Sequence, residues 1–248
     1  MPEIMPVPIA DRARLAKLVS ERLPGDALPA YYALNHPARR VKLFAIQNGP
    51  NLVGFVVAAQ TGQDLFRPLV IPVAANPEAL VGLLEAALRG GRPGLLHLPL
   101  EQRPWLPASV DLQDERVVDL HRLDPKGFPM EINVLVAETS TPEGLPRFEI
   151  RSGASVVAAA GLNWRGPFFA EVYVEGGPQA RSRGLTRSVL AAATGKMISE
   201  HLVPLTFVPE ADTAAQAEAT WVGYRRTGER FLVAQAVRSD GDPPVAGL

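Results

Sequence analysis

The residues best suited to chemistry in this 248-residue chain form a short basic segment, Arg181-Ser182-Arg183-Gly184-Leu185-Thr186. The apolar segment before it, residues 168–174, is typical of a strand, and the segment after it, residues 187–193, is rich in helix formers. A strand, a glycine-containing basic loop and a helix, in that order, present free backbone N–H groups and the positive end of a helix dipole. The pattern predicts an anion site, and phosphate is the anion it suits best.

The elements that must position this loop are predicted from hydrophobic spacing and turn residues. In the first half they are a helix over residues 11–23, strands over 41–46, 52–59, 69–73 and 94–98, and a helix that has Asn76 as its N-cap and runs to about Leu88. In the second half they are a hairpin of strands over 147–151 and 156–162, a strand over 168–174, a helix over 184–201, a strand over 205–208, a helix capped by Asp212 that reaches about Trp221, and a strand over 231–237. The helix over 184–201 has one apolar face at helical spacing, formed by Leu185, Val189, Ala193, Met197 and Ile198. The repeated order predicts two related domains, residues 1–125 and 126–238, joined by a turn-rich segment at 123–127 and followed by a disordered tail at 239–248.

Composition narrows the classes of function. The chain is 47% hydrophobic with a formal net charge of −1, so it can bury a core and has no general field that would attract nucleic acid. It contains no cysteine, which excludes disulfides, thiolate catalysis and cysteine-ligated zinc. Its four histidines are scattered without ligand spacing, so no metal site is expected. No apolar run reaches the roughly 18–20 residues of a membrane span, and Met1-Pro2-Glu3 lacks the basic start that is typical of a signal peptide. We therefore expect a cytoplasmic monomer or homodimer without nucleic-acid or membrane partners.

The second half, over about residues 131–238, resembles the GNAT superfamily of acetyl-CoA-dependent N-acetyltransferases. The family signature is a basic or Gln residue, two residues, Gly, any residue, then Gly or Ala, between a strand and a helix. The segment from Arg181 to Thr186 matches it except at Thr186, where a small polar residue leaves the backbone amides available.

A second family pattern begins at Asn and continues with Ala three residues later, Tyr seven later, and Gly-Phe at eleven and twelve. At these spacings the chain has Asp212, Ala215, Gly223 and Tyr224, but the Tyr position is Ala219. Because that Tyr commonly protonates the departing coenzyme A thiolate, the general acid is the gap in the match.

The resemblance implies an α/β (α+β) fold of two GNAT-like domains, each a mixed, mostly antiparallel sheet flanked by helices. It implies acetyl-CoA as the cosubstrate, no metal, and a small-molecule or peptide amine as the acceptor. The cofactor contacts that it implies are Val172, Val174, Arg181, Ser182, Arg183, Gly184, Leu185, Thr186 and Asp212. In the first half the corresponding segment, residues 74–78, has no basic residue, loses one amide to proline and carries a carboxylate, so that half looks like a degenerate domain without cofactor.

Two residues of the strand before the loop are the catalytic candidates. Glu171 resembles the general base of the histone-acetylating branch of the family, and apolar neighbours should raise the pKa of its carboxyl toward neutrality. Tyr173 shares its strand face by the two-residue period and is a candidate acid. The alternative is that Glu171 lies on an exposed strand face or pairs with Arg165 or Arg183. Trp164 either lines an acceptor pocket or packs in the core.

Three functions remain open at this point. The chain is an N-acetyltransferase acting on a primary amine, a non-catalytic acyl-CoA-binding or sensing module with the same fold, or an interaction protein that has lost the cofactor site. Ala219 and the degenerate first half motivate the second and third readings.

Overall fold

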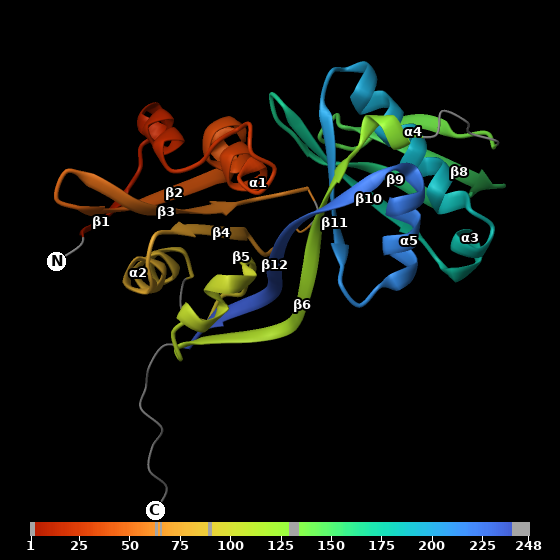
Figure 1. Cartoon of the computed structure of the whole chain (residues 1–248). Helices are drawn as coiled ribbons and strands as arrows, with labels where there is room; N and C mark the ends of the chain where they lie inside the picture. The colour runs from red at the N-terminus through yellow and green to blue at the C-terminus, as the bar shows by residue number, and fades with distance from the viewer. Residues whose placement is uncertain (1–2, 63, 65, 89–90, 129–133, 240–248) are drawn as a thin grey trace, which may run out of the picture. The chain divides into compact units, whose positions relative to one another are not determined.

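The computed structural model describes residues 3–62, 64, 66–88, 91–128 and 134–239 (Figure 1). Its contacts divide the chain into two compact units. The first comprises Met1–Val19, Tyr32–Arg116 and Phe231–Leu248, and the second comprises Ser20–Tyr31 and Val117–Arg230. The predicted boundary lies between residues 125 and 126. In the structure, residues 20–31 and 117–125 belong to the second unit instead of the first, and the segment from Phe231 belongs to the first instead of the second. The predicted tail at 239–248 lies outside the described residues beyond Ser239.

Two long strands explain this difference. Strand β6 (Val110–Leu123) and strand β12 (Tyr224–Arg238) each contribute residues to both units. The sequence predicts only the end of β12 and none of β6, because residues 111–116 are mostly charged or polar and lack strand alternation. Neither unit therefore coincides with one continuous half of the sequence.

The first unit is a mixed sheet flanked by helices. Its other strands are β1 (Glu3–Pro6), β2 (Val41–Asn48), β3 (Asn51–Ala59), β4 (Leu69–Ala74) and β5 (Gly94–Pro99). All described pairs are antiparallel except β4–β5, and the last residues of β12 pair with β5. Helix α2 (Pro77–Ala87) buries Leu80, Leu83 and Leu84 against this sheet. Its predicted N-cap is confirmed, since the side chain of Asn76 accepts a hydrogen bond from the backbone N–H of Ala79 at 2.9 Å.

The N-terminal helix predicted over residues 11–23 is wrong in type and length. A 3-10 helix, η1 (Ile9–Lys17), takes its place, and only Leu15 is buried in it. A helix with one buried side chain gains little from packing, and Pro24-Gly25 would end a longer helix in any case. A short helix α1 (Ala27–Ala30) follows and continues as a π-helical turn, η2 (Tyr31–Asn35). The remaining 3-10 turns are η3 (Ala38–Arg40), η4 (Leu100–Trp105) and η5 (Pro125–Gly127).

The second unit repeats the plan of sheet and helices. Its strands are β7 (Ala137–Ser140), β8 (Pro146–Ser152), β9 (Ser155–Arg165), β10 (Phe169–Gly176) and β11 (Val203–Pro209). Among its described pairs only β10–β11 is parallel, and β11 also pairs antiparallel with the end of β6. Helices α3 (Pro178–Ser182), α4 (Leu185–Ser199) and α5 (Thr213–Val222) complete the unit.

Helix α4 supplies much of the second core, as its spacing predicts. Leu185, Val189, Ala193 and Met197 are buried on one face, against residues of β9 and β10. Both units are thus mixed, mostly antiparallel sheets flanked by helices, which confirms the predicted fold class. Within the described ranges, no helix combines the length and apolar character that a membrane crossing requires.

A close backbone approach fixes the end of α5. Gly223 follows the helix with φ +104°, and a Cβ added there would lie 2.8 Å from the carbonyl carbon of Gly127. The carbonyl of Gly223 also accepts a hydrogen bond from the N–H of Asp124 at 2.9 Å. Glycine is therefore required at this position by conformation and by space.

Gly223→Ala should lower the free energy of unfolding by about 2–4 kcal/mol, because left-handed strain and a backbone clash add. The matched control is Gly144→Ala, where φ is +79° but no atom lies within 4 Å of the added Cβ. That control should lose only about 1–2 kcal/mol from conformation. Urea denaturation of both variants measures the difference, and equal losses would contradict the close approach.

Candidate active site

The parallel pair β10–β11 opens partway along its length. Hydrogen-bonded pairing runs from Phe169↔Val203 to Glu171↔Leu205, and both strands then continue without a described pairing between them. A cavity of about 260 Å³ lies at this opening. Its lining residues are Asn163, Glu171, Val172, Tyr173, Val174, Arg181, Leu190, Thr206, Phe207, Val208, Pro209, Asp212, Ala215, Glu218 and Ala219. Six of the predicted site residues are therefore gathered around one cavity.

Two neighbouring side chains of β9 hold the carboxylate of Glu171. The Nδ2 group of Asn163 donates to Oε1 at 2.6 Å, and Nε1 of Trp164 donates to Oε2 at 2.5 Å. Successive side chains of a regular strand point to opposite faces. Here the register passes from Glu171↔Trp164 to Val172↔Leu162, so Asn163 is an extra, bulged residue. The bulge explains how both side chains reach the same carboxylate.

The environment of Glu171 raises its pKa. Burial raises the pKa of this carboxyl from 4.5 to about 7, while the hydrogen bonds from Asn163 and Trp164 act in the opposite direction. The alternative ion pair with Arg165 is not formed, because Arg165 pairs with Glu200 at 2.8 Å. A carboxyl that titrates near neutrality beside a cavity suits proton transfer.

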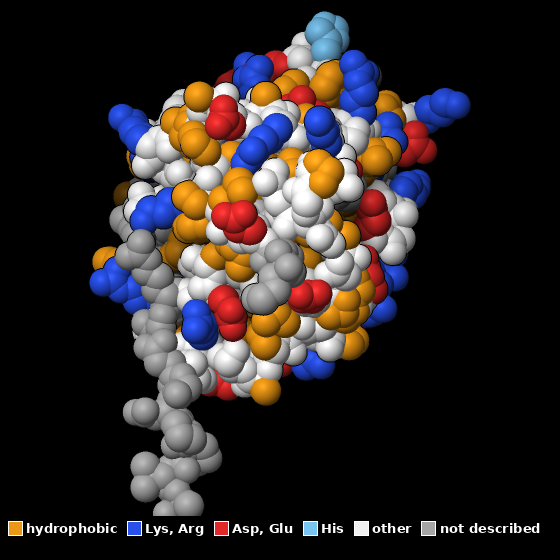
Figure 2. Space-filling model, turned by 90° about the vertical axis from the view of Figure 1, so that its left-hand side faces the viewer, with side chains coloured by type: hydrophobic (Ala, Val, Ile, Leu, Met, Phe, Trp, Pro, Cys, Tyr) orange, Lys and Arg blue, Asp and Glu red, His pale blue; other side chains and the backbone are white. Residues whose placement is uncertain are grey.

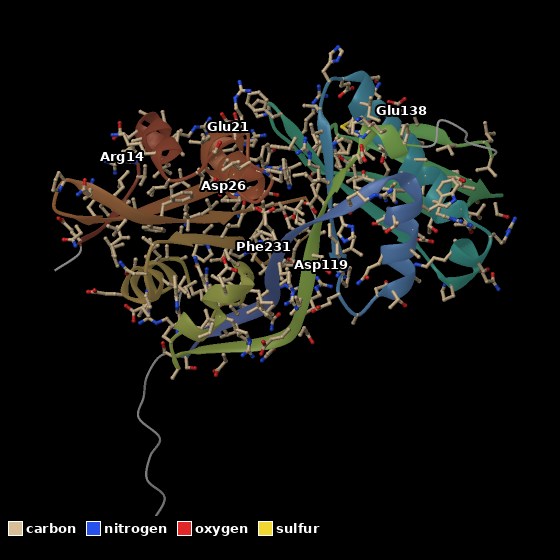
Figure 3. All side chains as sticks on the ribbon, in the orientation of Figure 1. Arg14, Glu21, Asp26, Asp119, Glu138 and Phe231 are labelled. Atoms are coloured by element: carbon tan, nitrogen blue, oxygen red, sulfur yellow. The ribbon has the colours of Figure 1, made fainter. Side chains whose placement is uncertain are left out.

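Trp164 is itself held from the N-terminal part of the chain. It is buried, and Tyr31 stacks on it with ring centroids 5.3 Å apart and an interplanar angle of 22°. Tyr31 ends the segment Ser20–Tyr31, which belongs to the second unit and contains the labelled Glu21 and Asp26 of Figure 3. Asp26 stabilises the turn of this segment, because its carboxylate accepts a hydrogen bond from the N–H of Ser20 at 2.9 Å. Trp164 therefore packs as core and also binds the candidate base.

The hydroxyl of Tyr173 is engaged by a cation. It accepts a hydrogen bond from Nη1 of Arg147 at 2.5 Å, and Arg147 also pairs with Glu149 and Glu175 at 2.9 and 2.8 Å. Burial raises the pKa of Tyr173, while Arg147 opposes that shift. Because a phenol that accepts one hydrogen bond retains its own proton, this arrangement is compatible with the predicted role as an acid.

The basic loop contains a short helix that the sequence does not predict. Helix α3 ends at Ser182, and Gly184 then takes a left-handed conformation, φ +70°, to start α4. Among the described residues, the backbone N–H groups of Leu185, Thr186 and Arg187 have no hydrogen-bond acceptor. These groups stand at the positive end of a 15-residue helix, an arrangement that favours an anion.

Thr186 is accommodated in the place where the family signature has Gly or Ala. Its side chain is buried, and its hydroxyl donates to Oε1 of Glu218 at 2.5 Å. Its methyl group occupies the space of a missing side chain at Gly176, since a Cβ there would lie 2.4 Å from it. The extra atoms of threonine thus pack inside the unit.

Arg181 and Asp212 bridge the cavity lining from α3 to α5. Nη1 of Arg181 lies 3.1 and 2.9 Å from the two carboxylate oxygens of Asp212. Asp212 is also the predicted N-cap, because it accepts the N–H of Ala215 at 2.9 Å. Helix N–H groups and then Arg181 lower the pKa of Asp212. The second family pattern therefore has a structural role at the start of α5.

Several residues with site contacts were missed by sequence reasoning. Arg187 lies over the ring of Trp221 at 5.1 Å, and its Nη2 would be 2.9 Å from a Cβ at Gly184.

His121, across from Thr206 in the β6–β11 pair, is buried with neither ring nitrogen hydrogen-bonded among the described residues. Burial lowers the pKa of His121. Only the register of the strands places His121 opposite Thr206, which lines the cavity, so no spacing in the sequence marks His121.

Comparison with known proteins identifies the fold. No protein-family model matches the sequence, and no curated protein matches it. Among solved structures, a GNAT-family acetyltransferase from Colwellia psychrerythraea shares 12% identity and a TM-score of 0.57 over 95% of this chain and 100% of its own. This is the GNAT fold.

Two further structures agree over nearly the whole chain. A tandem GNAT protein from the clavulanic acid biosynthesis pathway has 11% identity and a TM-score of 0.59, covering 98% of this chain and 100% of that one. A Drosophila protein has 13% identity and a TM-score of 0.69, covering 94% of this chain and 98% of its own. The predicted resemblance to the GNAT superfamily is thus confirmed in the fold.

The first unit has an equivalent parallel pair without the equivalent GNAT loop. Strands β4 and β5 pair at Leu69↔Leu95 and Val70↔Leu96. At the end of β4, the carbonyl of Ala74 accepts a hydrogen bond from Nε2 of Gln102 at 3.3 Å. The start of α2 is capped by its own Asn76, so that side chain occupies the place of an anion. In the described residues, no three His, Asp or Glu side chains gather as a metal site would require.

The raised pKa of Glu171 predicts a pH-dependent stability. Between pH 4.5 and about 7 the folded state retains this proton and the unfolded state has lost it. Stability should therefore fall as pH rises through this window, by up to about 3 kcal/mol. Glu171→Gln carries no such charge, so the difference in unfolding free energy between variant and wild type should grow from pH 4.5 to pH 8. Urea titrations at both pH values test this, and parallel pH profiles would contradict it.

Proposed function

We propose that the second unit is an N-acetyltransferase that moves an acetyl group from acetyl-CoA to a primary amine. The observation that carries the proposal is the raised pKa of Glu171 at the opening of β10 and β11. In the same unit, α4 begins with three backbone N–H groups that have no acceptor among the described residues. The GNAT fold supports the proposal, since one of the named neighbours is a GNAT-family acetyltransferase. We further propose a cytoplasmic monomer or homodimer in which the first unit is a tandem, degenerate copy.

The residues present fit coenzyme A. The N–H groups of residues 185–187 would hold the pyrophosphate, with Arg181 and Arg183 supplying positive charge. Ser182 and Gly184 shape this turn, and Val172 and Val174 line the cavity beyond it. When bound, the cofactor supplies a thioester, which is an already activated acyl group.

Glu171 would accept a proton from the acceptor. An alkylamine has a pKa of about 10.4 and is mostly protonated at neutral pH, so nucleophilic attack requires that the proton leave. The hydrogen bonds from Asn163 and Trp164 fix both oxygens of the carboxylate and keep its pKa from rising further. A base held in this way contributes roughly 10²–10⁴-fold to the rate.

The proton for the departing thiolate has no evident source on α5. Ala219 lines the cavity where the family has its Tyr, and Tyr224 is fully buried with its hydroxyl 2.8 Å from Oγ1 of Thr194. Tyr173 is the candidate that the cavity offers. Because a thiolate is a tolerable leaving group, transfer without a dedicated acid is also chemically reasonable.

Ala219 favours one second candidate, a module that binds acyl-CoA without catalysis. The two functions separate experimentally. Acetyl-CoA binding with no acetylation of any primary amine in a broad panel would support the module. Release of coenzyme A that depends on an amine would exclude it.

Glu171→Gln should reduce kcat about 10²–10⁴-fold and leave acetyl-CoA affinity within about twofold, because the base acts on the acceptor amine. In the wild type, the pH profile of kcat/KM should rise with an apparent pKa of about 7. Steady-state kinetics from pH 5.5 to pH 9 measure both. An unchanged kcat in the variant would remove Glu171 from the reaction.

Gly184→Val should abolish acetyl-CoA binding, because a β-branched residue is strained at φ +70° and would meet Arg187. Arg183→Ala should weaken binding about tenfold through loss of one phosphate contact. Arg225→Ala is the control, since this arginine binds carbonyls at the far end of α5. Isothermal titration with acetyl-CoA and with coenzyme A measures all three. Equal binding by wild type and Gly184→Val would rule out this loop as the site.

A further inference from the structure

The first unit contains a cavity that is larger than the one beside Glu171. It lies where β4 begins, at the opposite end of that strand from Ala74. It measures about 560 Å³ and lies where β2, β4 and β5 begin and where β3 and α2 end. Pro68 lines the cavity, and its carbonyl accepts a hydrogen bond from the N–H of Leu95 at 2.9 Å. The equivalent of the second unit's cavity would instead lie near Ala74, so this space is not a remnant of the acetyl-CoA site.

The charge of the cavity has one sign. Its ionisable lining residues are Arg39, Arg40, Lys42, Arg67 and Arg92. No Asp or Glu is among the described residues that line it. The chain as a whole has a net charge of −1, and on the face shown in Figure 2 basic and acidic side chains are interspersed. The cavity is thus a local concentration of positive charge.

Three of the cationic side chains have no described partner, and a fourth, Arg67, is held in one orientation by its neighbours. Within the described part of the chain, the side chains of Arg39, Lys42 and Arg92 form no hydrogen bond or ion pair. Arg67 is held on two sides, by Asp64 at 2.7 Å and by the side chain of Gln235 at 2.6 Å. Its Nη2 has no described partner, which leaves one arm of a fixed guanidinium for a ligand.

The end of helix α2 does not account for this cluster. Cations are favourable near a helix C-terminus, and Arg92 follows α2 closely. Arg238 already serves that end, however, by donating to the carbonyl of Glu85 at 3.1 Å. Arg39 and Lys42 come from η3 and β2, so the helix dipole gives no reason for their convergence. Like charges gathered in one cavity repel one another, and a bound anion would relieve this repulsion.

The rest of the lining is mainly apolar and includes one exposed aromatic ring. Phe66 is 93% exposed, although it lines the cavity. A flat apolar ring beside arginine and lysine is the combination that binds a base by stacking and phosphates by charge. The volume lies within the range of about 300–1,000 Å³ typical of small-molecule sites. We propose that this cavity binds a nucleotide, with its phosphates on Arg39, Lys42, Arg67 and Arg92 and its base against Phe66.

The test is isothermal titration of the full chain with ADP, pyrophosphate and adenosine at low salt. We expect ADP to bind at least tenfold more tightly than pyrophosphate or adenosine, because phosphates and base both contribute. The double variant Lys42→Glu/Arg92→Glu should weaken ADP at least tenfold. Its control, Lys17→Glu/Arg103→Glu, makes the same change of charge on exposed residues outside the cavity and should leave ADP affinity unchanged. Phe66→Ala should weaken ADP and leave pyrophosphate binding intact.

Other outcomes overturn the proposal. These are absence of ADP binding, equal loss in both double variants, and equal affinity for ADP and pyrophosphate. Because ADP is also a part of coenzyme A, the ADP titration is repeated with Gly184→Val, the variant expected to abolish acetyl-CoA binding at the second unit. Loss of ADP binding in this variant would place ADP at the second unit and overturn the proposal, whereas retained ADP binding supports it. Failure of the acetyltransferase proposal would appear separately, as equal binding of acetyl-CoA by wild type and Gly184→Val.

Discussion

The site depends on the place where β10 and β11 stop pairing. Up to Glu171↔Leu205 the two strands satisfy each other's backbone groups, and beyond it they leave the cavity that Val172 and Val174 line. At the same level the bulge at Asn163 turns two donors toward one carboxylate. Register therefore sets the position of the cavity and the chemistry of Glu171 together. A shift of one residue would move the carboxylate to the other face of the sheet.

Opposing effects set the acidity of Glu171. Burial alone would push the pKa of its carboxyl well up, and unpaired burial of the ionised form would be costly. Asn163 and Trp164 counter this by donating to the ionised form, which leaves a pKa of about 7. The position of the Trp164 donor depends on the position of the indole ring. Tyr31, which lies 133 positions earlier in the chain, stacks on that ring. The N-terminal segment thus influences the proposed proton-transfer group, Glu171, through one aromatic stack.

Local signals in the sequence predict the parts of this structure that are fixed locally. The caps at Asn76 and Asp212 and the buried face of α4 follow from residue type and spacing, and so does Glu171 as a candidate base. The partners of Glu171 could not be predicted, because the bulge at Asn163 exists only relative to β10. The role of β6 was hidden for a similar reason. Its polar first half lacks strand alternation and is strand only through long-range pairing.

The two units show how one arrangement of strands gives different chemistry. Each has a parallel pair that ends early, β4–β5 in the first unit and β10–β11 in the second. In the first, Gln102 and the self-capped start of α2 satisfy the freed polar groups from within the protein. In the second, the N–H groups of residues 185–187 have no acceptor among the described residues. A helix that caps itself with Asn76 satisfies N-terminal donors of its own, whereas a helix that starts at Gly184 does not. The residue before the helix therefore decides whether these donors are satisfied within the unit, and this difference is the basis of the phosphate site proposed for the second unit.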